Sequence, residues 1–245
     1  MSAHTDNERS EAGSCCAASC SLLVQGMPYR EAEPWFRHRH YAGRMPNVFR
    51  CFGLFNDGEC VGVVNYAAPN NPKLIAGVCG DQWAKHVLEL NRLVVVDGQP
   101  NAASLLVGRS IRLLPKPSVI VSYADASYGH VGYVYQATNF VYTGCPEAHQ
   151  ASIKIDGIPT NTRNLGSQFG KEGKFKGLAD AKEKLGDRLE VGERERKHRY
   201  VYMHGSKRDR KRMMRDLRYG IEPYPKGPTR RFEPKREIAT QLVMI

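Results

Sequence analysis

The segment that most constrains the fold is residues 87–96, which read Val-Leu-Glu-Leu-Asn-Arg-Leu-Val-Val-Val. So many aliphatic and β-branched residues predict a strand that is covered on both faces. Strict alternation sends Glu89 and Asn91 to one face of this strand. It sends Leu90 and Arg92 to the other. Burying these polar groups is costly unless each is paired. The strand is therefore either braced by an internal Glu–Arg network or entered by a substrate or cofactor pocket.

The surrounding pattern predicts a mixed α/β (α+β) fold, a twisted sheet flanked by helices. Strands at 49–55 and 59–66 flank Asn-Asp-Gly, a strong hairpin signal. A helix over 101–114, capped by Asn101 and stopped by prolines, leads to a strand at 118–123. Shorter apolar or amphipathic runs complete the pattern, with strands expected at 21–25, 140–142 and 199–203 and helices at 29–41, 129–138, 178–185 and 206–218.

The chain is basic, with 36 Lys and Arg against 25 Asp and Glu among 245 residues, a net charge of +11. Residues 171–237 hold 22 of these basic side chains and 12 acidic ones, which is nearly all of the surplus. Such an excess predicts an anionic partner, most often nucleic acid, with ribosomal or membrane-surface contacts as alternatives. We expect a flexible tail over 1–20, a catalytic core over 21–156 and a basic DNA-binding extension over 157–245. Most of 157–192 is expected as loops.

Neither a membrane span nor a secretion signal is visible in the sequence. No run approaches the ~18 apolar residues that a span needs, and the polar N-terminus lacks a signal pattern. We therefore expect no membrane partner and seven reduced cysteines. Cys15, Cys16 and Cys20 have no second Cys/His pair at zinc-site spacing, so no metal is assigned.

Two segments carry candidate chemistry. Asp125 and His130 follow the strand at 118–123, where α/β sheets usually bind ligands, and both can support acid–base work. A hydrogen-bonded turn with core tyrosines is the alternative. The second segment opens the helix at 101, where free N–H groups suit a pyrophosphate. It resembles in part the coenzyme A turn of GNAT acetyltransferases, with alanine where glycine belongs, through Gln99, Ala102, Ala103 and Ser104. A plain capped helix is the alternative.

The helix at 206–218 concentrates positive charge around a narrow apolar stripe of Met213, Met214 and Leu217. A run of charge is usually a solvated face. A stripe that anchors the helix favours contact with DNA phosphates instead. The expected contacts are Lys207, Arg208, Arg210, Lys211, Arg212, Arg215 and Arg218.

Several distinctive motifs follow one another along the chain. They are Arg-His-Tyr at 39–41, Leu-Glu-Leu-Asn-Arg-Leu at 88–93, Leu-Pro-Lys-Pro at 114–117, Ser-Tyr-Ala-Asp at 122–125 and the long motif at 129–139, with basic segments at 205–212 and 223–226. Together they make the chain resemble the phage Mom family. The resemblance covers roughly residues 20–228. It implies a GNAT acetyltransferase-like fold that acts on double-stranded DNA. The implied reaction converts adenine to N6-carbamoylmethyladenine, protecting phage DNA from restriction in the cytoplasm of the infected bacterial host.

The resemblance also implies the active site. The family's proposed catalytic positions are occupied by His40, Tyr41, Arg92 and Asp125, with Ser104 as the serine that opens the helix. The implied cofactor is acetyl-CoA or a related CoA thioester, although a carbamoylmethyl group needs a nitrogen that acetyl-CoA lacks. Iron is a further option, with His38, His40 or Asp125 as ligands, though no spacing establishes it. The oligomeric state stays open, a homodimer included.

A transferase on an adenine amino group must reach it, and base flipping is the usual route. Trp35, Tyr41, Tyr66 and Tyr123 are candidates to stack on an extruded base, although each is more often simply core. Two other functions stay open. One is a GNAT-type N-acetyltransferase acting on protein or tRNA, and the other is a DNA-binding protein without catalysis.

Overall fold

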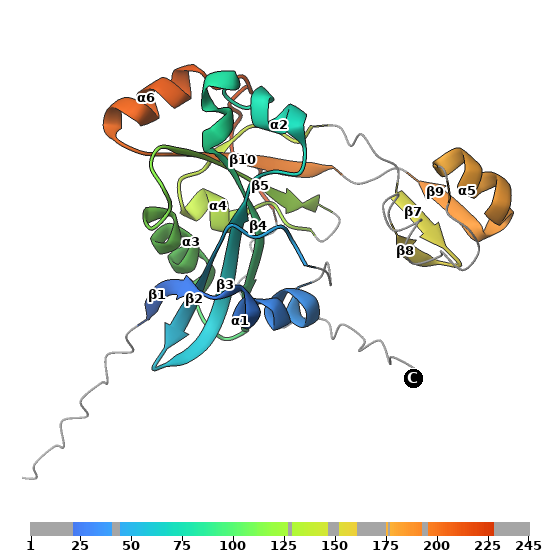
Figure 1. Ribbon diagram of the computed structural model, residues 1–245, viewed down its shortest axis with the longest axis horizontal. Helices are drawn as coiled ribbons and strands as arrows, with labels where there is room; N and C mark the ends of the chain where they lie inside the picture. The colour runs from blue at the N-terminus through green and yellow to red at the C-terminus, as the bar shows by residue number, and fades with distance from the viewer. Residues whose placement is uncertain are drawn as a thin grey trace, which may run out of the picture.

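The computed structural model describes residues 22–40, 45–126, 129–146, 152–160, 175, 177–192 and 196–227 (Figure 1). Its centre is a seven-stranded sheet in the order β1-β2-β3-β4-β5-β10-β6. Neighbouring strands are antiparallel except for β4 and β5, which run parallel. The expected mixed sheet flanked by helices is confirmed.

The elements of this body follow the predicted order closely. Its strands are β1 (Leu23–Met27), β2 (Arg50–Asn56), β3 (Glu59–Ala67), β4 (Val87–Val95), β5 (Ser118–Asp125), β6 (Val141–Tyr142) and β10 (Lys197–His204). Its helices are α1 (Tyr29–Pro34), which continues as a π-helical turn (Trp35–Arg39), α2 (Pro72–Gly77), a 3₁₀ helix (Asp81–His86), α3 (Ala102–Arg112), α4 (Tyr133–Ala137) and α6 (Lys207–Arg215). α2 and the 3₁₀ helix were not predicted. No helix within the described ranges is both long and apolar enough to cross a bilayer.

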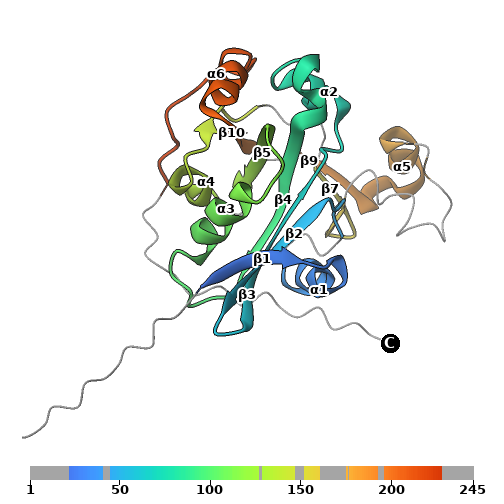
Figure 2. The same ribbon diagram turned by 60° about the vertical axis from the view of Figure 1, so that its left-hand side comes forward.

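Two apolar clusters cover the two faces of the sheet. α3 and α4 lie together on one side (Figures 1 and 2), where Leu106 and Tyr135 pack against Ile120 of β5. α2, the 3₁₀ helix and α6 pack on the opposite face, with Met213 fully buried against Val121. Strands β5 and β10 are therefore covered on both faces.

β10 was expected in the basic extension, but it lies inside the central sheet between β5 and β6. All eight of its residues pair with β5. Val201 and Met203 pack toward α6, and Tyr200 and Tyr202 pack toward α3 and α4. A strand with apolar side chains on both faces is stable only inside a sheet.

The described parts of the segment expected as loops at 157–192 belong to a second, smaller unit beside the central sheet (Figures 1 and 2). Its sheet has the order β8-β7-β9. The elements are β7 (Ser152–Ile155), β8 (Ile158–Thr160), α5 (Leu178–Leu185) and β9 (Leu189–Gly192). Ile153, Ile155 and Leu185 bury against one another in its core. The helix is confirmed, and the strands were missed because three or four residues are too few to show a period.

The polar strand β4 does not follow simple alternation. A bulge leaves Asn91 outside the pairing, since Asn65 of β3 faces Arg92 and Tyr66 faces Leu90. Leu90 and Leu93 consequently pack in the same cluster as α3. Arg92 shares the opposite face with Glu89, so the prediction that Arg92 lies on the face of Leu90 was wrong.

The two predicted helix caps have different outcomes. Ser206 and Asp209 form a complete capping box at the start of α6, as expected. Asn101 precedes α3 but makes no side-chain cap bond, because its backbone is left-handed, with φ at 58°. That prediction was wrong.

Among the described cysteines, Cys51, Cys60, Cys79 and Cys145 are free thiols, as expected. Cys15, Cys16 and Cys20 lie outside the described residues.

Tyr66 has no exposed surface, so it is not available to stack on a base as the sequence suggested. Its hydroxyl lies 2.8 Å from the Ser110 hydroxyl. Replacing Tyr66 with phenylalanine should lower the free energy of unfolding by about 1 kcal/mol, because a buried hydrogen bond is lost. Urea denaturation measures this, with Tyr29→Phe at an exposed position as the control. Equal effects of the two changes would contradict the prediction.

Candidate active site

A cavity of about 440 Å³ opens where β4 and β5 separate. Their parallel register ends with Leu90 opposite Ser122, and the Ser122 hydroxyl donates to the Leu90 carbonyl at 2.9 Å. Beyond this point the two strands continue as opposite walls of the cavity. Ala103 of α3 and residues 129–135 complete the lining.

Three of the four predicted catalytic side chains line this cavity: His40, Arg92 and Asp125. His40 follows the π-helical turn, Arg92 follows the bulge of β4, and Asp125 ends β5. Tyr41 lies outside the described residues. The structure thus brings together side chains from three distant segments, while their catalytic roles remain predictions.

Lys197 joins this group, although the sequence analysis missed it. Its Nζ lies 2.5 Å from Asp125 Oδ2, and Lys197 is the direct partner of Asp125 in the β5–β10 register. The carboxylate side chain is only 11% exposed, which shields the ion pair from solvent. No local motif marks Lys197, because its position depends on β10 pairing with β5.

Glu89 and Tyr123 add two further buried groups. Burial raises the pKa of Glu89, and the positive charges of Arg92 and Lys197 oppose that shift. Burial, followed by the negative charge of Glu89, raises the pKa of Tyr123 to about 12. The Tyr123 phenol therefore stays protonated at neutral pH, and its ring lines the cavity.

His40 is neutral in this environment. Burial, followed by the positive charges of Arg92 and Lys197, lowers its pKa to about 4. Arg92 is oriented by its own strand, since Nη1 donates to the Asn91 carbonyl at 2.6 Å. A neutral imidazole beside two cations can accept a proton or a hydrogen bond.

The lowered pKa of His40 makes a prediction for stability. Between about pH 4 and pH 6.5 the unfolded chain binds a proton at His40 that the folded chain does not, so stability falls as pH falls through this window. His40→Gln should therefore lose less stability than wild type between pH 7 and pH 5. Urea midpoints at the two pH values measure this. Parallel losses in both proteins would contradict it.

Two side chains hold the wall formed by residues 129–135. The Tyr200 hydroxyl donates to the Val131 carbonyl, and Gln136 Nε2 donates to the same carbonyl at 3.2 Å and to Tyr200 at 3.1 Å. Gly132 has φ of +81°, and a Cβ there would lie 2.5 Å from the Tyr200 ring. Glycine is therefore required at this position.

The predicted cofactor residues are placed unevenly. Ala103 lines the cavity, whereas Ala102 is buried in the core at 1% exposure. Gln99 and Ser104 do not line it, and the Ser104 hydroxyl donates to the Asn101 carbonyl at 2.9 Å. The first turn of α3 still meets the cavity at Ala103, and its amides are not capped by Asn101. Ala103 is therefore the point at which a group bound in the cavity would meet this turn.

The proposed iron ligands do not form a cluster. Among the described residues, no three His, Cys, Asp or Glu side chains are grouped closely enough to hold a metal ion. His38, His40 and Asp125 are among these described residues, so their arrangement does not support an iron site.

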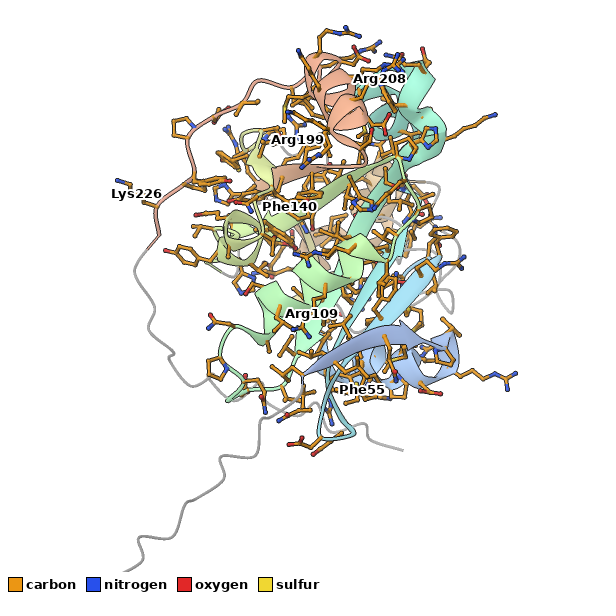
Figure 3. All side chains as sticks on the ribbon, turned by 90° about the vertical axis from the view of Figure 1, so that its left-hand side faces the viewer. Phe55, Arg109, Phe140, Arg199, Arg208 and Lys226 are labelled. Atoms are coloured by element: carbon orange, nitrogen blue, oxygen red, sulfur yellow. The ribbon has the colours of Figure 1, made fainter. Side chains whose placement is uncertain are left out.

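The predicted DNA contacts lie on and just after α6, at the end of the molecule where Arg208 is labelled in Figure 3. Arg212 lies over the Trp83 ring at 5.6 Å, and Arg215 Nε is 3.3 Å from Asp216. The Arg218 backbone N–H donates to the Val78 carbonyl at 3.0 Å. Arg212 and Arg215 therefore have partners within the protein, and Arg218 is held through its backbone.

Two comparisons with known proteins identify the same protein family. The family described as the Mom protein family matches residues 21–226. Methylcarbamoylase mom of Escherichia phage Mu is 30% identical over 214 residues, which cover 85% of each chain.

Two solved acetyltransferase structures also match. Spermidine N-acetyltransferase from Vibrio cholerae, in complex with CoA and spermine, gives a TM-score of 0.41 at 11% identity, covering 74% of this chain and 95% of that one. A putative acetyltransferase from Acinetobacter baylyi gives 0.42 at 13% identity, covering 76% and 94%. These structural likenesses are loose.

Proposed function

This chain belongs to the Mom protein family, and on that premise we propose that it is a transferase that converts adenine in double-stranded DNA to N6-carbamoylmethyladenine. The observation that carries the proposal is the shared cavity of His40, Arg92 and Asp125, three matched positions from distant segments. The proposed setting is phage DNA in the cytoplasm of the infected bacterial host. There the modification protects the DNA from restriction.

The reaction joins adenine N6 to the methylene carbon of a carbamoylmethyl donor, so that carbon loses its bond to a leaving group of the donor and N6 loses one proton. Neutral His40 is the group suited to accept that proton. Arg92 and Lys197 supply positive charge next to it, which stabilises negative charge on a donor or leaving group. Asp125 pairs with Lys197 and so fixes the position of that cation.

A base inside a duplex cannot enter this cavity, so the target adenine is flipped out. Tyr123 lines the cavity together with Tyr133 and Tyr135, and of the described stacking candidates named from the sequence it is the one in the cavity wall. Trp35 is less suited, because the Arg39 guanidinium already lies 4.3 Å from its ring.

A CoA thioester would be held by the first-turn amides of α3 and by the cavity wall at Ala103. It would supply a thioester carbonyl that a nitrogen source could convert to the carboxamide, with the CoA thiol as the leaving group. Acetyl-CoA carries neither that nitrogen nor a leaving group on its methyl carbon, so joining the methyl carbon to N6 would also require a two-electron oxidant, or a donor that already carries a leaving group there.

Mass analysis of nucleosides from cells that express the protein tests the function. A carbamoylmethyl adduct of adenine that is absent with His40→Gln is the expected result. DNA that binds but stays unmodified would instead favour a DNA-binding protein without catalysis. Acetylated protein or tRNA with unmodified DNA would favour an N-acetyltransferase. Either outcome would overturn the proposal.

A further inference from the structure

A second pocket of about 410 Å³ lies beneath α6 at the β10–β6 edge of the sheet. Its floor is formed by Val141, Tyr202 and Met203, above the fully buried Val201. Its rim is cationic, formed by Lys207, Arg210 and Lys211, with Asn139 beside them. Among the described residues that line it, none is acidic.

The cations of the rim share one face of α6, because positions i, i+3 and i+4 of a helix are neighbours. Met214 extends that face at i+7 and is 39% exposed. Arg208, Arg212 and Arg215 lie on a different face of α6. Two of its members already have partners, Arg212 over the Trp83 ring and Arg215 beside Asp216.

This pocket and the catalytic cavity lie at opposite ends of β10. Lys197, Arg199, Val201 and Met203 alternate along β10 and so point to the same side. Lys197 contacts Asp125 at the cavity end, and Val201 and Met203 line the pocket at the other end. Arg199 lies between them as a further cation. Its guanidinium is stacked 3.5 Å from the Tyr219 ring and bonded to Thr143.

We propose that the pocket of Lys207, Arg210 and Lys211 binds the sugar-phosphate backbone of the DNA substrate, about five base pairs from the flipped adenine. This rests on the proposed function. The floor suits a sugar, and the rim suits its phosphates.

The spacing of about five base pairs is estimated from the length of β10. β10 advances by about 3.3 Å per residue, so Lys197 and Tyr202 are about 17 Å apart. Duplex DNA advances by about 3.4 Å per base pair along each strand. Five base pairs therefore cover the distance from the cavity to the pocket.

A salt titration of duplex binding tests the pocket. The variant K207Q/R210Q/K211Q should make the slope of log affinity against log salt shallower by about 2 to 3, since each phosphate contact contributes about 0.9. The variant R208Q/R212Q/R215Q removes the same charge from the other face and should change the slope by less than about 1. K154Q/K182Q/K184Q, on the small unit, controls for net charge. Circular dichroism checks that each variant folds.

A truncation series tests the spacing. Duplexes are shortened stepwise on one side of the adenine that the protein modifies. Wild-type affinity should fall once fewer than about five base pairs remain on that side. The pocket variant should not respond to that truncation. Equal slope changes in the two α6 variants, or a pocket variant that still responds to truncation, would overturn the inference. Binding is measured without catalysis, so a failure of adenine modification would be seen separately.

Discussion

Replacement of Asp125 by asparagine should reduce DNA modification roughly 100-fold or more, the range typical of groups that act in proton transfer or hold its partners. Asparagine keeps the shape of the side chain and removes its charge. Lys197 Nζ, 2.5 Å from the carboxylate, would then lose its counter-ion in a largely buried position. The measurement is the yield of modified adenine per enzyme molecule under single-turnover conditions, with duplex affinity measured alongside.

The matched control for this change is Asp156→Asn. Asp156 also accepts a bidentate pair, from Arg188, but it lies on the small unit with half of its side chain exposed. Exposed pairs contribute little to stability, so the control should modify DNA at the wild-type rate. If Asp125→Asn modified DNA at that same rate, Asp125 would not belong to the active site and the predicted site would be wrong.

Replacement of Lys197 by methionine should reduce DNA modification about as much as Asp125→Asn does. The change removes a cation that acts on His40, Glu89 and Asp125 together. Arginine at this position keeps the charge and should retain a measurable part of the activity. Lys154→Met is the control, since Lys154 forms an exposed pair with Glu190 at 3.7 Å.

If Asp125 and Lys197 act as a unit, the double variant should be no worse than the more severe single one. The pH profile adds a second readout. Loss of Lys197 removes one of the charges that lower the pKa of His40, so the acidic limb of activity should move to higher pH. Additive losses with an unchanged profile would contradict a shared role.

Most of the sheet could be predicted because its signals are local. Asp57 and Gly58 mark the hairpin of β2 and β3, and Ser206 marks the start of α6 with a capping box that the structure contains. The motif at 122–125 likewise placed Asp125 at the end of β5. In each case the residues that determine the structure are a few positions apart.

The rest depends on contacts between distant residues. The bulge at Asn91 reverses the alternation of β4, and nothing within the strand announces it. The position of Lys197 depends on β10 entering the sheet between β5 and β6. Gln99 and Ser104 were assigned by motif, but neither lines the cavity, and the Ser104 hydroxyl bonds to the Asn101 carbonyl instead. A pattern can name candidate residues, and only tertiary pairing decides which of them meet.

The late arrival of β10 also affects how the chain is synthesised and folds. Residues 126–196 must follow β5 before its partner strand emerges from the ribosome. Until then β5 is an open edge that presents Val119, Ile120 and Val121, the kind of strand on which nascent chains aggregate. The same pairing brings Lys197 to Asp125. A chain interrupted before residue 197 would thus combine an unprotected edge with an incomplete site, and such fragments should be insoluble rather than partly active.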